Sequence, residues 1–99
     1  LKGCVMVKLE KDDILGLDDF KEVNQFLANK IKEARLAKRI SVASLSEKSG
    51  VASDYISKVE NGKKNKVSLY IYLKLIYYLD IDCELFLKGL NDLEPFRNK

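Results

Sequence analysis

Catalysis and metal binding usually require side chains that this sequence lacks or holds far apart. It contains no histidine, the residue most used for proton transfer near neutral pH and for metal ligation. Its two cysteines, Cys4 and Cys83, lie near opposite ends without the spacing of a zinc site or a disulfide framework, and we expect free thiols. No phosphate-cradling glycine loop appears. We therefore expect no enzyme, no metal site and no cofactor.

The chemistry that the sequence does favour is binding to a polyanion, because its charge is segregated. Residues 1–25 hold four basic and six acidic side chains (net −2), residues 26–66 hold ten and four (+6), and residues 67–99 hold four and five (−1). A cationic middle between two mildly acidic ends suits a focused polyanion-binding surface. The alternative is a basic face that only contacts water.

Helices are predicted to position these charges. Apolar side chains recur at three- and four-residue steps, and Ser41, Ser68 and Asp82 stand where helix N-caps belong. The five predicted helices cover residues 18–39 (as one helix or two), 42–48, 53–61, 69–79 and 83–88. Gly50 permits a tight turn between the second and third, and two short helices joined in this way form a helix-turn-helix unit. The predicted fold class is all-α.

The two ends of the chain carry separate expectations. Residues 4–10 alternate between apolar and polar side chains, with Val5 and Val7 on one side, which predicts a short strand. This strand either pairs with its copy across a dimer axis, which we favour, or forms an isolated arm, or is disordered. In the tail, Leu93 and Phe96 suit docking but not a sixth full helix. The expected divisions are an arm with the start of the first helix (1–25), a binding domain (26–88) and a tail (89–99).

No feature of the sequence points to a membrane or to export. No apolar run approaches the ~20 residues that span a bilayer. The apolar stretch at the N-terminus turns charged at Lys8, too early for the core of a secretory signal. We therefore expect a cytoplasmic protein.

The stretch from Gly50 to Lys63 resembles the turn and recognition helix of the phage-repressor or XRE-type helix-turn-helix family almost position for position. The segments 31–35 and 68–87 extend the likeness, which covers roughly residues 26–88. The resemblance implies a five-helix repressor-like helix-turn-helix bundle, here with a short N-terminal extended arm or strand. It also implies that the helix over 53–61 enters the major groove of duplex DNA.

The resemblance further implies which side chains meet the base edges. They are Ser53, Asp54, Tyr55, Ser57 and Lys58. Lys58 would donate to guanine, and Tyr55 would touch a thymine methyl group or a phosphate. Asp54 either accepts from a cytosine amino group or caps the first turn of its helix. Because Ala52 stands where the family commonly has a capping serine, Ser53 either contacts a base or takes over the cap.

Phosphate contacts are implied for a second set of residues, which would hold the register of the complex without selecting sequence. This set comprises Ser41, Asn61, Lys63, Lys64 and Lys66. The alternative for the lysines is an exposed loop that serves solubility. Arg35 and Glu60 occupy the places of a family ion pair that ties the first helix to the end of the recognition helix.

Proteins of this family typically bind palindromic half-sites as two-fold dimers, so a homodimer is implied. The candidate interface consists of Val5, Val7, Tyr70, Lys74, Tyr77 and Tyr78. Within the helix over 69–79, the spacing predicts internal positions for Leu69, Tyr72, Leu73, Ile76 and Leu79. The alternative for the tyrosines is that they cover the core.

The predicted function is sequence-specific binding of duplex DNA by a dimeric transcriptional regulator, a repressor or an autoregulator. The alternative is a protein-interaction module that keeps this fold, such as an antitoxin or the binding partner of a larger regulator. Two departures from the family pattern support that alternative: Val42 stands where a DNA-contacting glutamine is common, and Ala52 where a serine is common.

Overall fold

The computed structural model describes residues 14–64 and 66–98, and these residues form an all-helical bundle. Its elements are η3 (Leu17–Phe20), α1 (Lys21–Ala37), α2 (Val42–Ser49), α3 (Ser53–Glu60), α4 (Leu69–Leu79), α5 (Cys83–Leu87), η4 (Leu90–Asp92) and η5 (Phe96–Asn98). The predicted all-α fold with five α-helices is confirmed for this part of the chain, and the first predicted helix is a single α-helix, α1, preceded by the short 3-10 helix η3. The predicted strand over residues 4–10, with Val5 and Val7, lies outside the described residues.

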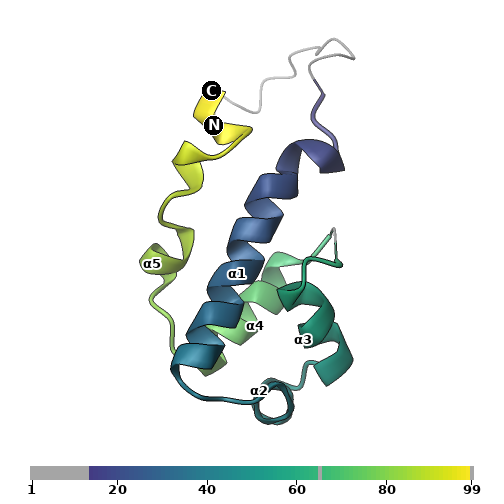
Figure 1. Cartoon of the computed structure of the whole chain (residues 1–99), viewed down its shortest axis with the longest axis vertical. Helices are drawn as coiled ribbons and strands as arrows, with labels where there is room; N and C mark the ends of the chain where they lie inside the picture. The colour runs from purple at the N-terminus through teal and green to yellow at the C-terminus, as the bar shows by residue number, and fades with distance from the viewer. Residues whose placement is uncertain (1–13, 65, 99) are drawn as a thin grey trace.

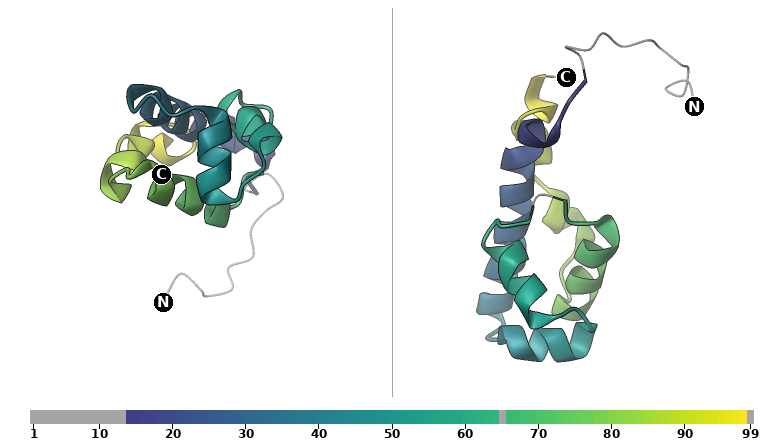
Figure 2. Two further views of the ribbon diagram at one scale, coloured as in Figure 1. Left: turned by 90° about the horizontal axis from the view of Figure 1, so that it is seen from below. Right: turned by 90° about the vertical axis from the view of Figure 1, so that its right-hand side faces the viewer.

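α1 is the longest helix, and α3, α4 and α5 pack against it, whereas α2 packs mainly against α3 and α4 (Figure 1). α2 lies across the C-terminal end of α1, while α3 and α4 stand beside its second half and α5 lies on its other side (Figures 1 and 2). The first turns of α1 extend beyond α3 and α4, and the C-terminal tail runs alongside them (Figure 1).

The core lies where α1, α2, α3 and α4 meet. Its largest fully buried side chains are Ile31, Leu45, Ile56, Val59, Leu75 and Leu79. Burying one such side chain contributes about 1.5–3 kcal/mol, so these contacts supply much of the stability of the fold. Phe86 of α5 joins the core beside Tyr72 of α4, with 5.7 Å between the ring centroids.

The predicted inner face of α4 is partly wrong. Leu69 and Leu73 are 69% and 47% exposed, whereas Leu75 is fully buried. Tyr72, Ile76 and Leu79 are buried as predicted. A helix that is apolar on nearly every side offers more than one stripe at helical spacing, and periodicity alone cannot select among them. Packing against the other helices decides which stripe is inside.

The predicted caps are confirmed by hydrogen bonds. Ser41 Oγ accepts from the Ser44 N–H at 3.0 Å, and Ser68 Oγ accepts from the Ile71 N–H at 3.2 Å. The carboxylate of Asp82 accepts from the Glu84 N–H at 2.8 Å. Each bond satisfies a backbone donor that has no partner within the helix. These local rules explain why α2, α4 and α5 start where they do.

The tail docks on the beginning of α1, as predicted for Phe96. The Phe96 ring meets the ring of Phe20 edge-on at a centroid distance of 6.2 Å. The Glu94 N–H donates to Glu22 Oε1 at 3.4 Å, and Leu93 is half-buried. The tail therefore packs against the first turn of α1 rather than adding a full helix.

Candidate nucleic-acid interface

A tight turn sets the angle between α2 and α3. Gly50 ends α2 in the left-handed conformation (φ 78°), which a residue with a Cβ adopts only at an energetic cost, and its N–H donates to Ser46 O at 2.8 Å. The next residue, Val51, is buried, and its N–H donates to Ser49 Oγ at 3.1 Å. With its two ends fixed in this way, the turn presents α3 at the surface of the molecule (Figure 1).

α3 has one buried side and one accessible side. Ile56, Val59 and Glu60 are buried against the rest of the molecule. Ser53, Asp54 and Lys58 are exposed. Two further residues of the predicted base-contacting set, Tyr55 and Ser57, are half-buried. All five of these predicted side chains therefore retain some solvent exposure.

Ser53 does not cap α3, so the capping alternative for Ser53 is wrong, whereas Asp54 lies in the first turn of α3, where its charge complements the helix dipole, without making a capping hydrogen bond. Ala52 occupies the N-cap position, and within the described residues no side chain makes a capping hydrogen bond there. Asp54 instead pairs with Lys58 one turn later, with 3.1 Å between Oδ2 and Nζ. An exposed pair of this spacing is worth only about 0.3–0.5 kcal/mol, so either partner can leave it for a stronger contact.

The α3–α4 loop collects the next group of predicted residues. Asn61 ends α3 and is exposed, as are Lys63 and Lys66. Lys64 is half-buried, and its Nζ lies 5.0 Å from the centroid of the Tyr55 ring in a cation–π contact. This contact places one loop cation beside α3.

Ser41 lies at a separate point of the same region. It shares a shallow hollow between α2 and α3 with Ser53, and Ser44, Ser46 and Glu47 also line this hollow. Ser41 Oγ uses a lone pair to cap α2, so its own O–H remains available as a donor. The structure thus brings Ser41 next to the start of α3.

Arg35 and Glu60, which the resemblance pairs, form a two-pronged ion pair. Arg35 Nε donates to Glu60 Oε2 at 2.7 Å, and Nη2 donates to Oε1 at 3.0 Å. Arg35 Nη1 also donates to Ile40 O at 2.8 Å. The hydrogen bond to Glu60 raises the pKa of Arg35 above its usual range, against the effect of burial. The pair joins α1 to the last turn of α3 and has a scaffold role.

Part of the positive charge in the middle of the sequence makes hydrogen bonds to other parts of the chain at the surface. Lys30 donates to Leu85 O at 2.5 Å and to Lys88 O at 3.2 Å, at the C-terminal end of α5. Lys38 donates to Asp80 O at 3.2 Å, just after α4. Cations at helix C-termini satisfy the last carbonyls and complement the helix dipole. Of the other cations in residues 26–66, Lys58, Lys63, Lys64 and Lys66 lie on α3 and in the α3–α4 loop, whereas Lys32, Arg39 and Lys48 lie on α1, after α1 and on α2.

Sequence reasoning missed a polar bridge formed by Asn24. Its Nδ2 donates to Lys64 O at 2.8 Å, and its Oδ1 accepts from the Tyr72 O–H at 3.2 Å. Burial, aided by the nearby Tyr55, raises the pKa of Tyr72 to about 12, so this hydroxyl remains a donor at neutral pH. Asn24 lies 40 and 48 positions from its two partners in the sequence, and no local pattern signals the contact.

The predicted interface residues of α4 lie on its outer side. Tyr70 and Tyr77 are 65% and 76% exposed, so these two rings do not cover the core. Lys74 Nζ lies 5.1 Å from the Tyr70 ring centroid, and the rings of Tyr77 and Tyr78 meet edge-on at 4.9 Å. Together with the exposed Leu73, these four residues form an apolar stripe with polar tips.

No helix in the described part of the chain has the length and apolar character needed to cross a membrane.

The segment that contains α2, the turn and α3 matches a known protein family. A family model described as helix-turn-helix matches residues 31–86, more than half of the chain. The match begins within α1, includes α2, the turn and α3, and ends in α5. A search of curated proteins gives no match. The chain therefore belongs to the XRE-type helix-turn-helix family of DNA-binding transcription regulators.

Proposed function

We propose that this protein binds a specific duplex DNA sequence in the cytoplasm as a homodimer on palindromic half-sites, and acts as a repressor or an autoregulator. The supporting observation is the two-sided character of α3, which buries one side and carries Ser53, Asp54 and Lys58 on the other. A protruding helix fits the major groove, where each base pair displays a distinct pattern of donors and acceptors.

In this proposal, the pair between Asp54 and Lys58 opens on DNA. Lys58 donates to O6 or N7 of a guanine, and Asp54 accepts from the amino group of a cytosine. Because the two side chains reach each other in the free protein, they would contact one C·G pair or two adjacent ones. Ser53, Ser57 and Tyr55 complete the base-contacting surface, with Tyr55 against a thymine methyl group or a phosphate.

The phosphate contacts are proposed for the two flanks of α3. Lys63, Lys64, Lys66 and Asn61 serve one flank from the α3–α4 loop, and Ser41 serves the other from the start of α2. Such contacts fix orientation and contribute affinity on any sequence. The lysine ammonium groups, the Asn61 amide and the Ser41 hydroxyl are donors of the required kind.

The proposed dimer surface is the outer stripe of α4, with Tyr70, Leu73, Lys74, Tyr77 and Tyr78. Tyrosine suits an interface because it buries a large area and keeps a polar tip. Val5 and Val7 remain in the proposed interface on the strength of their alternation in the sequence.

The test is a titration of DNA binding against salt. We expect log K to fall linearly with log[salt], with a slope of about −0.9 for each phosphate contacted. Selection from a random duplex library should then return a palindrome with a common half-site. Failure of the chain to bind any duplex at low salt would refute the proposal.

The second candidate, a module that binds another protein, has its own supporting observation. Val42 is half-buried and packs against the core, so it does not supply the DNA contact that a glutamine gives at the corresponding family position. Leu69 and Leu73 add exposed apolar area. Absence of DNA binding together with capture of a protein through α4 would favour this candidate.

A further inference from the structure

We infer that Asn24 is a positioning residue for DNA binding, because it fixes the backbone of the α3–α4 loop and thereby holds the Lys64 ammonium beside the recognition helix. This inference rests on the proposed DNA-binding function. Asn24 lies in the first part of α1, before residue 31, where the family match begins. The contact is therefore supplied by a part of the chain that the family pattern does not include.

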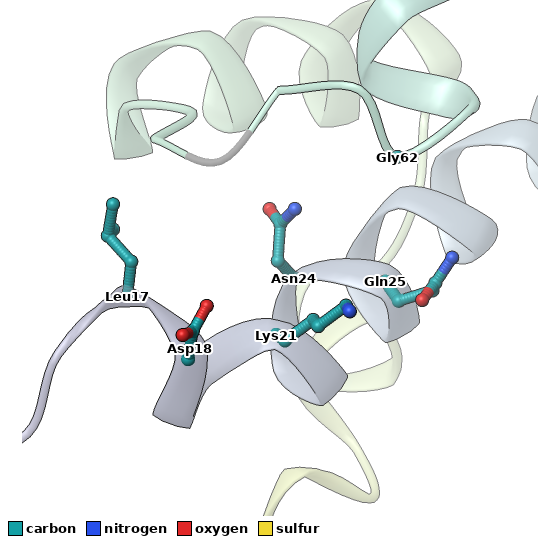
Figure 3. A pocket seen from close by; sticks show the side chains of 6 residues that line it. All are labelled: Leu17, Asp18, Lys21, Asn24, Gln25 and Gly62. Carbon is teal, nitrogen blue, oxygen red and sulfur yellow. The ribbon is translucent and has the colours of Figure 1, made fainter.

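Asn24 makes hydrogen bonds through both polar atoms of its side-chain amide. Its Nδ2 donates to Lys64 O at 2.8 Å, and its Oδ1 accepts from the Tyr72 hydroxyl at 3.2 Å. The side chain points from α1 toward the loop (Figure 3). An amide is suited to this place because it offers a donor and an acceptor together. One side chain thus bridges α1, the loop and α4.

The described part of the loop contacts its neighbours at several points, and the bond from Asn24 is one of them. Within the described part of the loop, backbone hydrogen bonds run from the Gly62 N–H to Val59 O (3.1 Å) and from the Lys63 N–H to Lys58 O (2.8 Å). At Gly62 (φ 71°) the loop also passes close to α1, since an added Cβ would lie 3.3 Å from Gln25 Nε2. At Lys64, the bond from Asn24 ties the main chain of the loop to α1.

Both the backbone carbonyl and the side-chain ammonium group of Lys64 have contacts that fix their positions. Its carbonyl is held by Asn24, and its Nζ lies 5.0 Å from the Tyr55 ring centroid on α3. A cation fixed in advance loses less conformational entropy when it meets a phosphate than a free lysine does. Lys63 and Lys66, by contrast, are exposed.

The test compares charge-matched variants on one helix. Asn24→Asp keeps the size of the side chain and the acceptor for Tyr72 but removes the donor to Lys64 O. Asn29→Asp adds the same charge at an exposed position of α1. We expect Asn24→Asp to weaken binding to specific and unrelated duplexes alike by about three- to tenfold, the range expected for one lost hydrogen bond. Asn29→Asp should change binding much less.

A double-mutant cycle separates positioning from a general loss of stability. Asn24→Ala should reduce the salt slope by up to about 0.9, as expected for one lost phosphate contact, with base preference unchanged. In a Lys64→Ala background the same change should have almost no further effect on affinity. Additive effects, or a wild-type slope for both Asn24 variants, would overturn the inference. A wild-type chain that binds no DNA would instead refute the proposed function.

Discussion

Lys58 and Lys64 are both cations at α3, but their surroundings assign them different tasks. Lys58 stands on the accessible side of the helix beside Asp54, whereas Lys64 lies over Tyr55 at the flank. We expect Lys58→Ala to relax preference at one base pair of each half-site, with a cost of about 1–3 kcal/mol on the preferred sequence. Lys64→Ala should weaken binding to all sequences alike.

Binding of both variants to a panel of single-base-pair substitutions of the selected site measures this difference. Equal losses on every duplex for both variants would contradict the division between base and phosphate contacts.

Tyr72 gives the folded state a specific response to alkali. Below pH 10 its hydroxyl is protonated in the folded and the unfolded chain, and between pH 10 and about 12 only the unfolded chain loses the proton. The free energy of unfolding should therefore fall as the pH rises through this window. Tyr72→Phe should lack this component of the fall, which urea denaturation at several pH values can measure. Identical pH dependence for both proteins would count against the burial of this hydroxyl.

At the scale of elements, the ion pair between Arg35 and Glu60 holds α3 against α1. The Glu60 side chain is 3% exposed, so Glu60→Ala would leave the Arg35 guanidinium, itself 11% exposed, without its partner. We expect a loss of about 3–5 kcal/mol in the free energy of unfolding, measured by urea denaturation.

The matched control for Glu60→Ala is Asp54→Ala, which breaks the exposed pair on the same helix and should cost less than about 0.5 kcal/mol. Replacing Arg35 and Glu60 together by methionine should recover part of the loss, because no buried charge then remains. Similar losses for Glu60→Ala and Asp54→Ala would contradict this account.

Elements governed by local rules could be predicted from the sequence, whereas those decided by packing could not. Ser41 and Ser68 mark helix starts through bonds to residues three positions later, and Gly50 ends α2 through its own backbone angles. The inner face of α4 was predicted only in part, because Leu69 and Leu73 fit the helical period as well as the buried residues do. That choice depends on helices distant in the sequence.

The same division applies to the candidate site. The order of charged and polar residues along α3 is a local property of the sequence, and the family resemblance is based on it. The bridge from Asn24 to Lys64 and Tyr72 spans 40 and 48 positions in the sequence, and only the folded chain brings the three together. The contacts of Lys30 and Lys38 could not be predicted from the sequence for the same reason, because each lysine donates to a backbone carbonyl at the end of a helix that is distant in the sequence.

At the scale of the whole molecule, the outer stripe of α4 decides whether two copies associate. Leu73 lies in this stripe and is 47% exposed. We expect Leu73→Glu to shift the protein toward monomer in sedimentation, because a charge would be buried in the proposed interface. Leu36→Glu, at a comparably exposed position of α1, is the control. A monomeric wild type, or equal association of both variants, would place the interface elsewhere.

The docking of the tail has a consequence for how binding is measured. The tail contacts Phe20, the last residue of η3, and Glu22 in the first turn of α1, and Asn24 lies two residues beyond Glu22 on α1. The residues of one helical turn move together, so a shift of the first turn of α1 also displaces the Asn24 amide, which donates to Lys64 O. We therefore expect a chain that ends at Gly89 to bind DNA with a different affinity from the whole chain, although it keeps every residue proposed to contact DNA.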